Sequence, residues 1–218
     1  MIKIGVIGTG KWGKNHIRIF SQSNNCNLVG IADVDETKQA LAHEFNAKFF
    51  TDYTELLKEV DAVSVVVPTD LHYGIVKQCL EAGKHVLVEK PITLTSTGAK
   101  ELVGLAKQKN LVLSVGYLFR FNPAVIELKR RLKEKSGQVQ YISGRYIHSS
   151  KPPRADSGVI FNLGIHMIDI LNFVLDKKPK KVYCKRTNFL NPQNEDSASI
   201  VLKYENFFAS LDVSCCHP

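Results

Sequence analysis

Three glycines near the start of the chain have the spacing of a phosphate-binding turn. They form the pattern Gly8-x-Gly10-x-x-Gly13 within the segment IKIGVIGTGKWGKNHIRIF, residues 2–20. Gly8 permits a tight turn, Gly10 lacks a Cβ and lets a pyrophosphate approach the backbone, and Gly13 lets the next helix pack closely. That helix would offer unpaired N–H groups and its positive dipole end to the phosphates. The spacing therefore predicts a dinucleotide site.

A carboxylate about 20 residues farther on completes this pattern. The apolar run 28–32 ends at Asp33, which is placed to accept hydrogen bonds from an adenosine ribose and would favour NAD over NADP. Thr9, Lys11 and Trp12 lie in the glycine turn and are predicted to contact the cofactor, Lys11 and Trp12 mainly through backbone N–H groups. The alternative is a glycine-rich turn in another α/β protein, which the order strand, turn, helix, strand and acid disfavours.

The elements that position these residues alternate between strand and helix. Apolar, β-branched runs predict strands at 2–7, 28–33, 48–50, 61–67, 84–88 and 111–115, with helices at 36–45, 71–83 and 96–109 between them. Such alternation predicts an α/β fold with a doubly wound parallel sheet of the Rossmann type. Ligands of such sheets bind beyond the carboxyl ends of the strands, where Asp33, Pro68 and Lys90 are expected.

The pattern changes in the second half of the chain. A helix is predicted from Pro123 to about Lys135 with Asn122 as its cap, a second helix at 159–175, and strands at 139–148, 181–189, 197–204 and 207–214. We expect an α+β domain with a mainly antiparallel sheet. The predicted domains are 1–118, which binds the dinucleotide, and 119–218, which binds substrate and forms oligomers. The last strand would leave an open edge, so this domain is expected to be incomplete at its C-terminus or covered by a partner subunit.

Composition excludes several classes of function. The 218 residues are 44% hydrophobic and 23% charged, and no apolar run approaches the length of a membrane span. The net charge is +8, and the basic residues are spread along the chain except for a cluster at 129–133. This cluster indicates a solvated helix face and not a nucleic-acid site. The five cysteines lack metal-site spacing, so free thiols and no metal are expected. We expect a cytoplasmic protein with no membrane and no nucleic-acid partner.

Four motifs together resemble the Gfo/Idh/MocA family of NAD(P)-dependent sugar and cyclitol oxidoreductases. They are Gly8-x-Gly10-x-x-Gly13, Pro68-Thr69-x-x-His72, Glu89-Lys90-Pro91 and Asn162-x-Gly164-x-His166-x-x-Asp169. The resemblance covers nearly the whole chain, and Glu-Lys-Pro is its most specific part. It implies a Rossmann domain, an α+β domain for substrate and oligomerisation, and a catalytic lysine and histidine. It also places Pro68, Thr69, His72 and Glu89 beside the cofactor, although a structural role for His72 is at least as probable.

The resemblance implies that Lys90 and His166 are the catalytic residues. Oxidation of a carbinol requires removal of the hydroxyl proton, and an imidazole, which titrates near neutral pH, suits this task. Lys90 would hydrogen-bond the substrate oxygen and stabilise its developing negative charge. The family commonly has Asp at the position of Asn162, which is able to hydrogen-bond a substrate hydroxyl but not to act as a base. Asn at this position resembles the subgroup that acts on UDP-N-acetylglucosamine-type sugars.

Three further residues are candidates for substrate binding. Asp169 lies one helical turn after His166 and is expected either to orient it or to make another polar contact. Arg120 and Arg154 are candidates for binding an anionic substrate such as a nucleotide-sugar pyrophosphate, because the rigid guanidinium fork suits phosphate. An ordinary salt bridge is the alternative for each.

Two functions from different classes follow. The first is a dehydrogenase that acts on a secondary alcohol of a sugar or nucleotide sugar. The second is a dinucleotide-binding sensor, regulator or degenerate relative without turnover, because one scaffold hosts both. Lys90 and His166 favour the enzyme, whereas Asn162 and the abrupt C-terminus favour the second function. In either case the open sheet predicts a homodimer or homotetramer.

Overall fold

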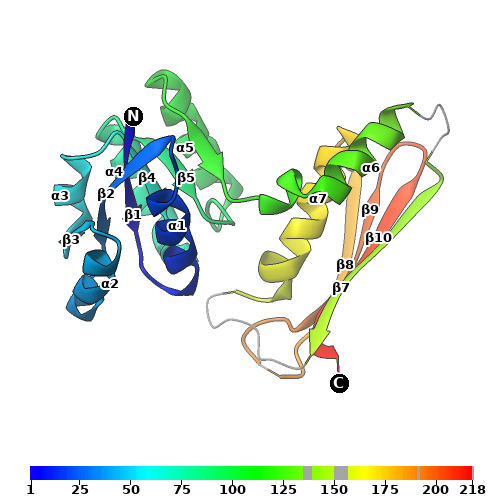
Figure 1. Cartoon of the computed structure of the whole chain (residues 1–218). Helices are drawn as coiled ribbons and strands as arrows, with labels where there is room; N and C mark the ends of the chain where they lie inside the picture. The colour runs from blue at the N-terminus through cyan, green and yellow to red at the C-terminus, as the bar shows by residue number, and fades with distance from the viewer. Residues whose placement is uncertain (135–138, 150–156, 191, 218) are drawn as a thin grey trace. The chain divides into compact units, whose positions relative to one another are not determined.

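The computed structural model describes residues 1–134, 139–149, 157–190 and 192–217. The chain divides into two compact units, Met1–Gly116 and Tyr117–Pro218, each with its own sheet (Figure 1). The division lies within a few residues of the boundary expected from sequence. No helix among the described residues is long and apolar enough to cross a membrane.

The first unit is a six-stranded parallel sheet in the order β3-β2-β1-β4-β5-β6, the order of a dinucleotide-binding Rossmann fold. Its elements are β1 (Ile2–Ile7), α1 (Lys11–Ser21), β2 (Cys26–Ala32), α2 (Gln39–Glu44), β3 (Lys48–Phe50), α3 (Tyr53–Leu57), β4 (Ala62–Val65), α4 (His72–Glu81), β5 (His85–Val88), α5 (Ser96–Gln108) and β6 (Leu113–Val115). The alternation of strands and helices is as predicted from the apolar runs.

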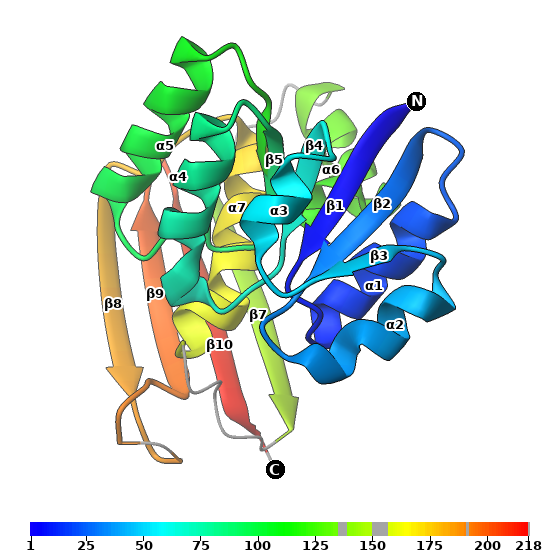
Figure 2. The same ribbon diagram turned by 90° about the vertical axis from the view of Figure 1, so that its left-hand side faces the viewer.

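Helices cover both faces of this sheet. On one face α1 and α2 pack through a cluster that includes Ile17, Ile31 and Ala42. On the other face α3, α4 and α5 pack through a larger cluster that includes Leu56 and Leu80 (Figure 2). Because both faces are buried, the central strands carry continuous β-branched runs and not an alternating pattern.

The second unit has a four-stranded mixed sheet in the order β7-β10-β9-β8. Its elements are α6 (Pro123–Glu134), β7 (Tyr141–Ser149), a π-helical turn (Ile160–Gly164), α7 (Ile165–Leu175), β8 (Lys181–Thr187), β9 (Ser197–Lys203) and β10 (Phe208–His217). Two of the three pairings in the described sheet are antiparallel, whereas β7 and β10 run parallel. The predicted helix at 159–175 is therefore a π turn followed by an α-helix.

One face of the second sheet packs against α7. Leu171 of the helix lies in a cluster with Ile200, Leu202, Ala209 and Leu211 from β9 and β10. On the opposite face, Tyr141 stacks on Phe208 and Arg145 lies 3.8 Å from Asp212, and these side chains are exposed. The sheet is thus covered on one face by its own chain.

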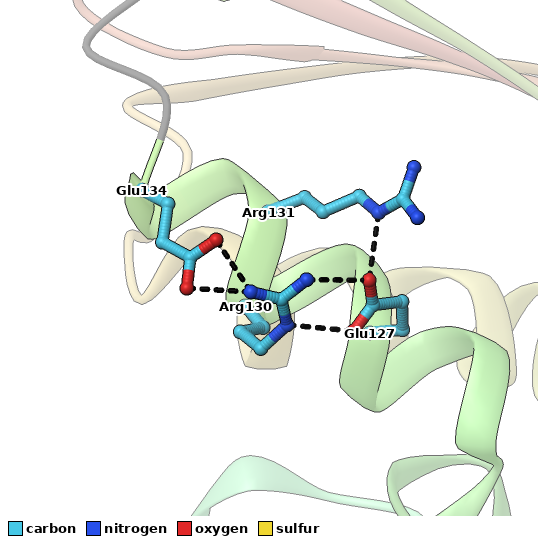
Figure 3. Close-up of polar contacts among 4 residues, drawn as sticks. All are labelled: Glu127, Arg130, Arg131 and Glu134. Atoms are coloured by element: carbon cyan, nitrogen blue, oxygen red, sulfur yellow. Dashed lines mark hydrogen bonds and ion pairs between the residues drawn. The ribbon is translucent and has the colours of Figure 1, made fainter.

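The basic cluster at 129–133 belongs to an exposed face of α6. Arg130 pairs with Glu127 and Glu134, and Arg131 pairs with Glu127, all within one or two helical turns (Figure 3). Hydrogen bonds from Arg130 and Arg131 lower the pKa of Glu127 to about 2. Acidic neighbours thus balance both arginines on the same helix surface. Elsewhere, all five cysteines are free thiols.

Candidate functional site

The glycine turn between β1 and α1 is built as the spacing predicts. Gly8 has φ of +93°, and a Cβ there would lie 2.5 Å from the carbonyl oxygen of Val66. A Cβ on Gly13 would lie 2.9 Å from the carbonyl carbon of Gly8 and closer still to its oxygen. In contrast, a Cβ on Gly10 would meet nothing within 4 Å. Gly8 and Gly13 are thus required by the fold, whereas Gly10 leaves space beside the backbone.

The first turn of α1 faces this space. The helix begins at Lys11 with Gly10 as its N-cap, and no side chain caps its amides. Helix N-termini of this kind bind phosphate through backbone N–H groups and the helix dipole. Trp12 lies in this turn and is 48% exposed. The cradle therefore fits the pyrophosphate of a dinucleotide.

Asp33, at the end of β2, is fixed by the glycine turn. Its Oδ2 accepts hydrogen bonds from the backbone N–H of Thr9 at 2.8 Å and from the Thr9 hydroxyl at 2.5 Å. Its Oδ1 accepts the N–H of Asp35 at 3.1 Å. Thr9 itself is fully buried. The sequence argument used only the position of Thr9 in the turn and missed that its hydroxyl orients the carboxylate.

The turn after β4 carries Pro68, Thr69 and His72. Pro68 begins a short 3-10 turn, and Thr69 is buried within it. His72 is 1% exposed, with Nδ1 2.7 Å from the carbonyl oxygen of Pro91 and Nε2 3.0 Å from that of Val67. Both ring nitrogens therefore lie against protein carbonyl groups, as the structural interpretation of this histidine expects.

Glu89 and Lys90 follow β5 at the same edge of the sheet. The Glu89 Oε1 lies 3.3 Å from Nε2 of His16, and its Oε2 accepts the Lys90 backbone N–H at 3.1 Å. Burial raises the pKa of Glu89, but the hydrogen bonds from His16 and from the Lys90 N–H, with the positive charges nearby, outweigh burial and lower it below 4.5. The carboxylate is therefore held in its charged form directly beside Lys90.

His16 and Ser64 were missed by the sequence argument. Nδ1 of His16 lies 2.8 Å from the Ser64 hydroxyl, so the imidazole connects the middle of β4 to Glu89. The signal was present in the spacing, because His16 lies three residues after Gly13 on α1 and so shares the helix face that packs on the sheet.

In the second unit, Asn162 and His166 lie on either side of the change from π turn to α-helix. Asn162 belongs to the π turn and its N–H donates to the carbonyl of Gly158. His166 lies in the first turn of α7 and is 7% exposed, and its ring is edge-on to that of Phe119 with the ring centroids 5.1 Å apart. Single π turns inside helices are frequent at functional sites.

The start of this helical segment is fixed by Glu195. Its carboxylate accepts the Ile160 N–H at 3.1 Å, and its carbonyl accepts the Val159 N–H at 2.9 Å. A Cβ on Gly158 would overlap the Glu195 carboxylate. Glycine at 158 therefore lets an acidic side chain cap the helix that carries His166, which is a role that sequence reasoning missed.

Asp169 and Arg120 form an ion pair. Arg120 donates through Nε to both carboxylate oxygens, at 3.1 and 2.9 Å, and through Nη2 to Oδ1 at 2.5 Å. The hydrogen bonds with Asp169 raise the pKa of Arg120. The guanidinium also lies over the rings of Tyr117 and Phe173. Asp169 thus engages Arg120, the salt bridge considered above as the alternative, while the Arg120 side chain remains 44% exposed.

Arg154 lies outside the described residues. Lys90 belongs to the first unit, whereas Asn162, His166, Asp169 and Arg120 belong to the second. Within the described ranges, no group of three or more His, Cys, Asp or Glu side chains could hold a metal ion. Chemically, the first unit offers a phosphate cradle and a lysine at the carboxyl ends of its parallel strands, and the second offers a histidine and an asparagine in one helical segment.

Comparison with protein families matches both units. Residues 2–117 match a family described as "Oxidoreductase family, NAD-binding Rossmann fold", and residues 125–218 match the "GFO/IDH/MocA C-terminal domain". The two matches together cover nearly the whole chain. The first match identifies the first unit as an NAD-binding Rossmann domain.

Individual relatives are dehydrogenases. The UDP-N-acetylglucosamine 3-dehydrogenase of Acidithiobacillus ferrooxidans is 33% identical over 182 residues, which are 83% of this chain and 56% of that protein. Inositol 2-dehydrogenase 2 of Saccharopolyspora erythraea is 31% identical over 216 residues, 94% of this chain and 64% of that protein. A solved structure of the former enzyme, GnnA, covers all of this chain with a TM-score of 0.91 at 30% identity. The chain covers 68% of that structure's chain.

Proposed function

The chain belongs to the Gfo/Idh/MocA family of oxidoreductases with an NAD-binding Rossmann fold, and from that premise we propose that it oxidises a secondary hydroxyl of a sugar or nucleotide sugar. When bound, NAD supplies the hydride acceptor for this reaction. A nucleotide sugar is the substrate of one similar enzyme, and inositol, a cyclitol, is that of another. NADP is less suited to the site because Asp33 would repel a phosphate on the adenosine ribose.

The cofactor-binding residues are those of the first unit. The amides at the start of α1, around Lys11 and Trp12, would hold the pyrophosphate. Asp33, fixed by Thr9, would accept hydrogen bonds from the adenosine ribose. The strand-end turns that contain Pro68, Thr69, Glu89 and Lys90 would line the remainder of the site.

Lys90 and His166 would carry the proton chemistry. An imidazole nitrogen of His166 would take the proton from the substrate hydroxyl, and the Lys90 ammonium would hydrogen-bond the same oxygen as negative charge develops there. Asn162 would hydrogen-bond a neighbouring hydroxyl. Arg120 and Arg154 would attract a phosphorylated substrate, with Asp169 limiting the directions in which the Arg120 fork can turn.

The observation that carries this proposal is the position of Lys90 relative to the cradle. β1 leads into the glycine turn, β4 is its neighbour, and β5, which ends beside Lys90, is the neighbour of β4. All three strands run parallel, so the amine emerges at the sheet edge that holds the phosphate cradle. An amine beside a dinucleotide site is suited to polarise an oxygen at the reacting carbon.

The test is turnover with NAD against a panel of sugars, cyclitols and UDP-sugars, followed at 340 nm. We expect reduction of NAD with at least one member of the panel. Lys90→Ala should reduce kcat by about 10²-fold or more, because a preorganised donor to a developing oxyanion is worth that much. Undiminished turnover in Lys90→Ala would contradict the assigned role.

A dinucleotide-binding protein without turnover is the second candidate. Asn162 favours it, because an amide in place of a carboxylate cannot raise the basicity of His166 by its charge. Measurable NAD affinity combined with no turnover on the whole panel would support this candidate. Turnover abolished in Lys90→Ala would exclude it.

The exposed face of the second sheet is the basis for a proposed homodimer or homotetramer. Tyr141, Arg145, Phe208 and Asp212 combine stacked rings with a charged pair on the face of the sheet opposite α7. A surface that combines exposed rings with charges of both signs is able to pair with a second copy of itself. Light scattering at micromolar concentration should give a mass at least twice that of one chain, and a monomer would count against the oligomer.

We also propose that the second unit holds the substrate.

A further inference from the structure

Two histidines flank the Glu89–Lys90–Pro91 segment from opposite faces of the first sheet. His16 belongs to α1 and contacts Glu89, whereas His72 begins α4 and contacts Pro91. Helices α1 and α4 belong to the clusters on the two different faces. Lys90 therefore lies between Glu89, whose carboxylate contacts one imidazole, and Pro91, whose backbone carbonyl contacts the other.

His16 fixes the segment on the N-terminal side of Lys90. It lies between the Ser64 hydroxyl, at 2.8 Å, and the Glu89 carboxylate, at 3.3 Å. Glu89 in turn accepts the Lys90 N–H through its second oxygen. A Cβ on Gly116 would lie 3.0 Å from the Glu89 carboxylate, so glycine at the end of β6 gives this side chain its space.

His72 fixes the segment on the C-terminal side. Its ring is almost fully buried and connects the Pro91 carbonyl to the Val67 carbonyl in the turn after β4. Carbonyl oxygens only accept hydrogen bonds, and a neutral imidazole has one N–H, so this form donates to one of the two carbonyls at a time. The ring thereby lies between the two strand-end turns that border the dinucleotide cradle, within hydrogen-bond distance of a carbonyl in each.

We propose that His16 and His72 are positioning residues that set the backbone on either side of Lys90 and thereby aim its amine. A lysine side chain has a flexible four-carbon stem, so the place of its ammonium depends on a well-fixed backbone. Neither imidazole needs to touch substrate for this role. The inference rests on the proposed function only in that Lys90 acts on the substrate oxygen.

The test uses the different reach of asparagine and glutamine. An Asn amide nitrogen lies near the position of Nδ1 of a histidine, and a Gln amide nitrogen lies near that of Nε2. His16→Gln therefore keeps a donor for Glu89, whereas His16→Asn reaches only toward Ser64. At the other site the order is reversed, because His72→Asn keeps a donor for Pro91, whereas His72→Gln keeps one only for Val67.

The positioning role predicts opposite preferences at the two sites. We expect kcat to fall about ten- to hundredfold in His16→Asn and His72→Gln, because misplacement by about 1 Å costs this much, and much less in His16→Gln and His72→Asn. The KM for NAD should stay within about threefold in all four variants. A misplaced Lys90 amine weakens an interaction that is made only in the transition state, so kcat falls while NAD binding is retained. The same preference at both sites, or equal loss in all four, would overturn the proposal.

A second readout does not depend on activity. The backbone N–H of Lys90 donates a hydrogen bond to Glu89. Hydrogen exchange of this N–H, measured by NMR, should therefore be about tenfold or more faster in His16→Asn than in His16→Gln, and in His72→Gln than in His72→Asn. Unfolding midpoints in urea identify any global loss of stability. If the parent protein turns over no sugar, the proposed function fails and exchange alone decides the positioning role. Unchanged exchange at Lys90 in all four variants would refute it.

Discussion

The glycine turn offers a sharp test, because two of its glycines should respond to the same substitution in different ways. Gly13→Ala would place a methyl group 2.9 Å from the Gly8 carbonyl carbon and closer to its oxygen, both of which belong to the backbone. No side chain can rotate away to relieve this contact. Gly10→Ala would place the same methyl group in open space, at a residue with φ of −61°.

The magnitudes follow from these contacts. In Gly13→Ala the start of α1 must withdraw from the turn by about 1 Å, and we expect a loss of unfolding free energy of about 1–3 kcal/mol, as for other overpacked sites. Gly10→Ala should leave stability unchanged or raise it by about 0.4–1 kcal/mol, because alanine has less freedom in the unfolded chain. Both variants should bind NAD at least about tenfold more weakly, because a methyl at residue 10 would occupy the proposed path of the pyrophosphate and the shift in Gly13→Ala would displace the amides of α1.

The assay has a probe within the site. Trp12 is the one tryptophan of the chain and is 48% exposed in the first turn of α1, so its fluorescence should change on NAD binding. Urea unfolding of each variant gives stability, and titration with NAD gives affinity. Full NAD affinity in Gly10→Ala would refute the assignment of this space to the pyrophosphate. Unchanged stability in Gly13→Ala would refute the packing argument.

Three further predictions concern carboxylates. Asp33→Ala should weaken NAD binding more than NADP binding, and equal losses in calorimetry would exclude it as the ribose ligand. The pKa of Glu89 is lowered on folding, so its stabilisation is present above pH 4.5 and is lost as pH falls through its folded pKa. Glu89→Gln should therefore lose about 1–3 kcal/mol at pH 7 and converge with the parent in acid, and a difference that persists in acid would contradict this. Asp169→Asn should lose about 1–2 kcal/mol in urea unfolding because it removes the charge of a buried carboxylate that pairs with a half-exposed arginine, whereas Glu127→Gln, whose carboxylate is exposed, should change little, and equal effects would contradict the burial argument.

The sequence predicts the first unit well because one physical rule governs it. A parallel sheet buried on both faces requires continuous apolar strands, and the runs at 28–32 and 61–67 are therefore readily recognised. The glycine pattern is equally informative, since Gly8 and Gly13 are demanded by backbone contacts that no other residue allows.

The second unit is predicted less completely, because its features depend on contacts distant in sequence. Alternation in β7 and β10 indicates which side chains share a face but not that the two strands run parallel. The π turn before His166 depends on Glu195, which caps it from more than 30 residues away. The pairing of Arg120 with Asp169 spans a similar gap, so the charge pattern alone left the salt bridge open.

In the first unit the residues missed from sequence share one cause. Thr9 hydrogen-bonds Asp33, whereas Ser64 contacts His16 and His16 contacts Glu89, and the partners in these contacts lie 24 to 73 residues apart. A motif identifies the residues expected at the chemistry, whereas the groups that hold them become visible only when the strands are placed side by side. The sequence therefore predicts candidate residues for the chemistry, but not the contacts that support them.

The central claim is that the Lys90 amine and the His166 imidazole act on one substrate oxygen. A double-mutant cycle tests it most directly, with kcat measured for the parent, Lys90→Ala, His166→Ala and the double variant on a sugar that the parent oxidises. Groups that act as a unit are strongly non-additive, so the double variant should be at most about tenfold slower than the slower single variant. Losses that multiply in full would show that the two groups act independently and would contradict the claim.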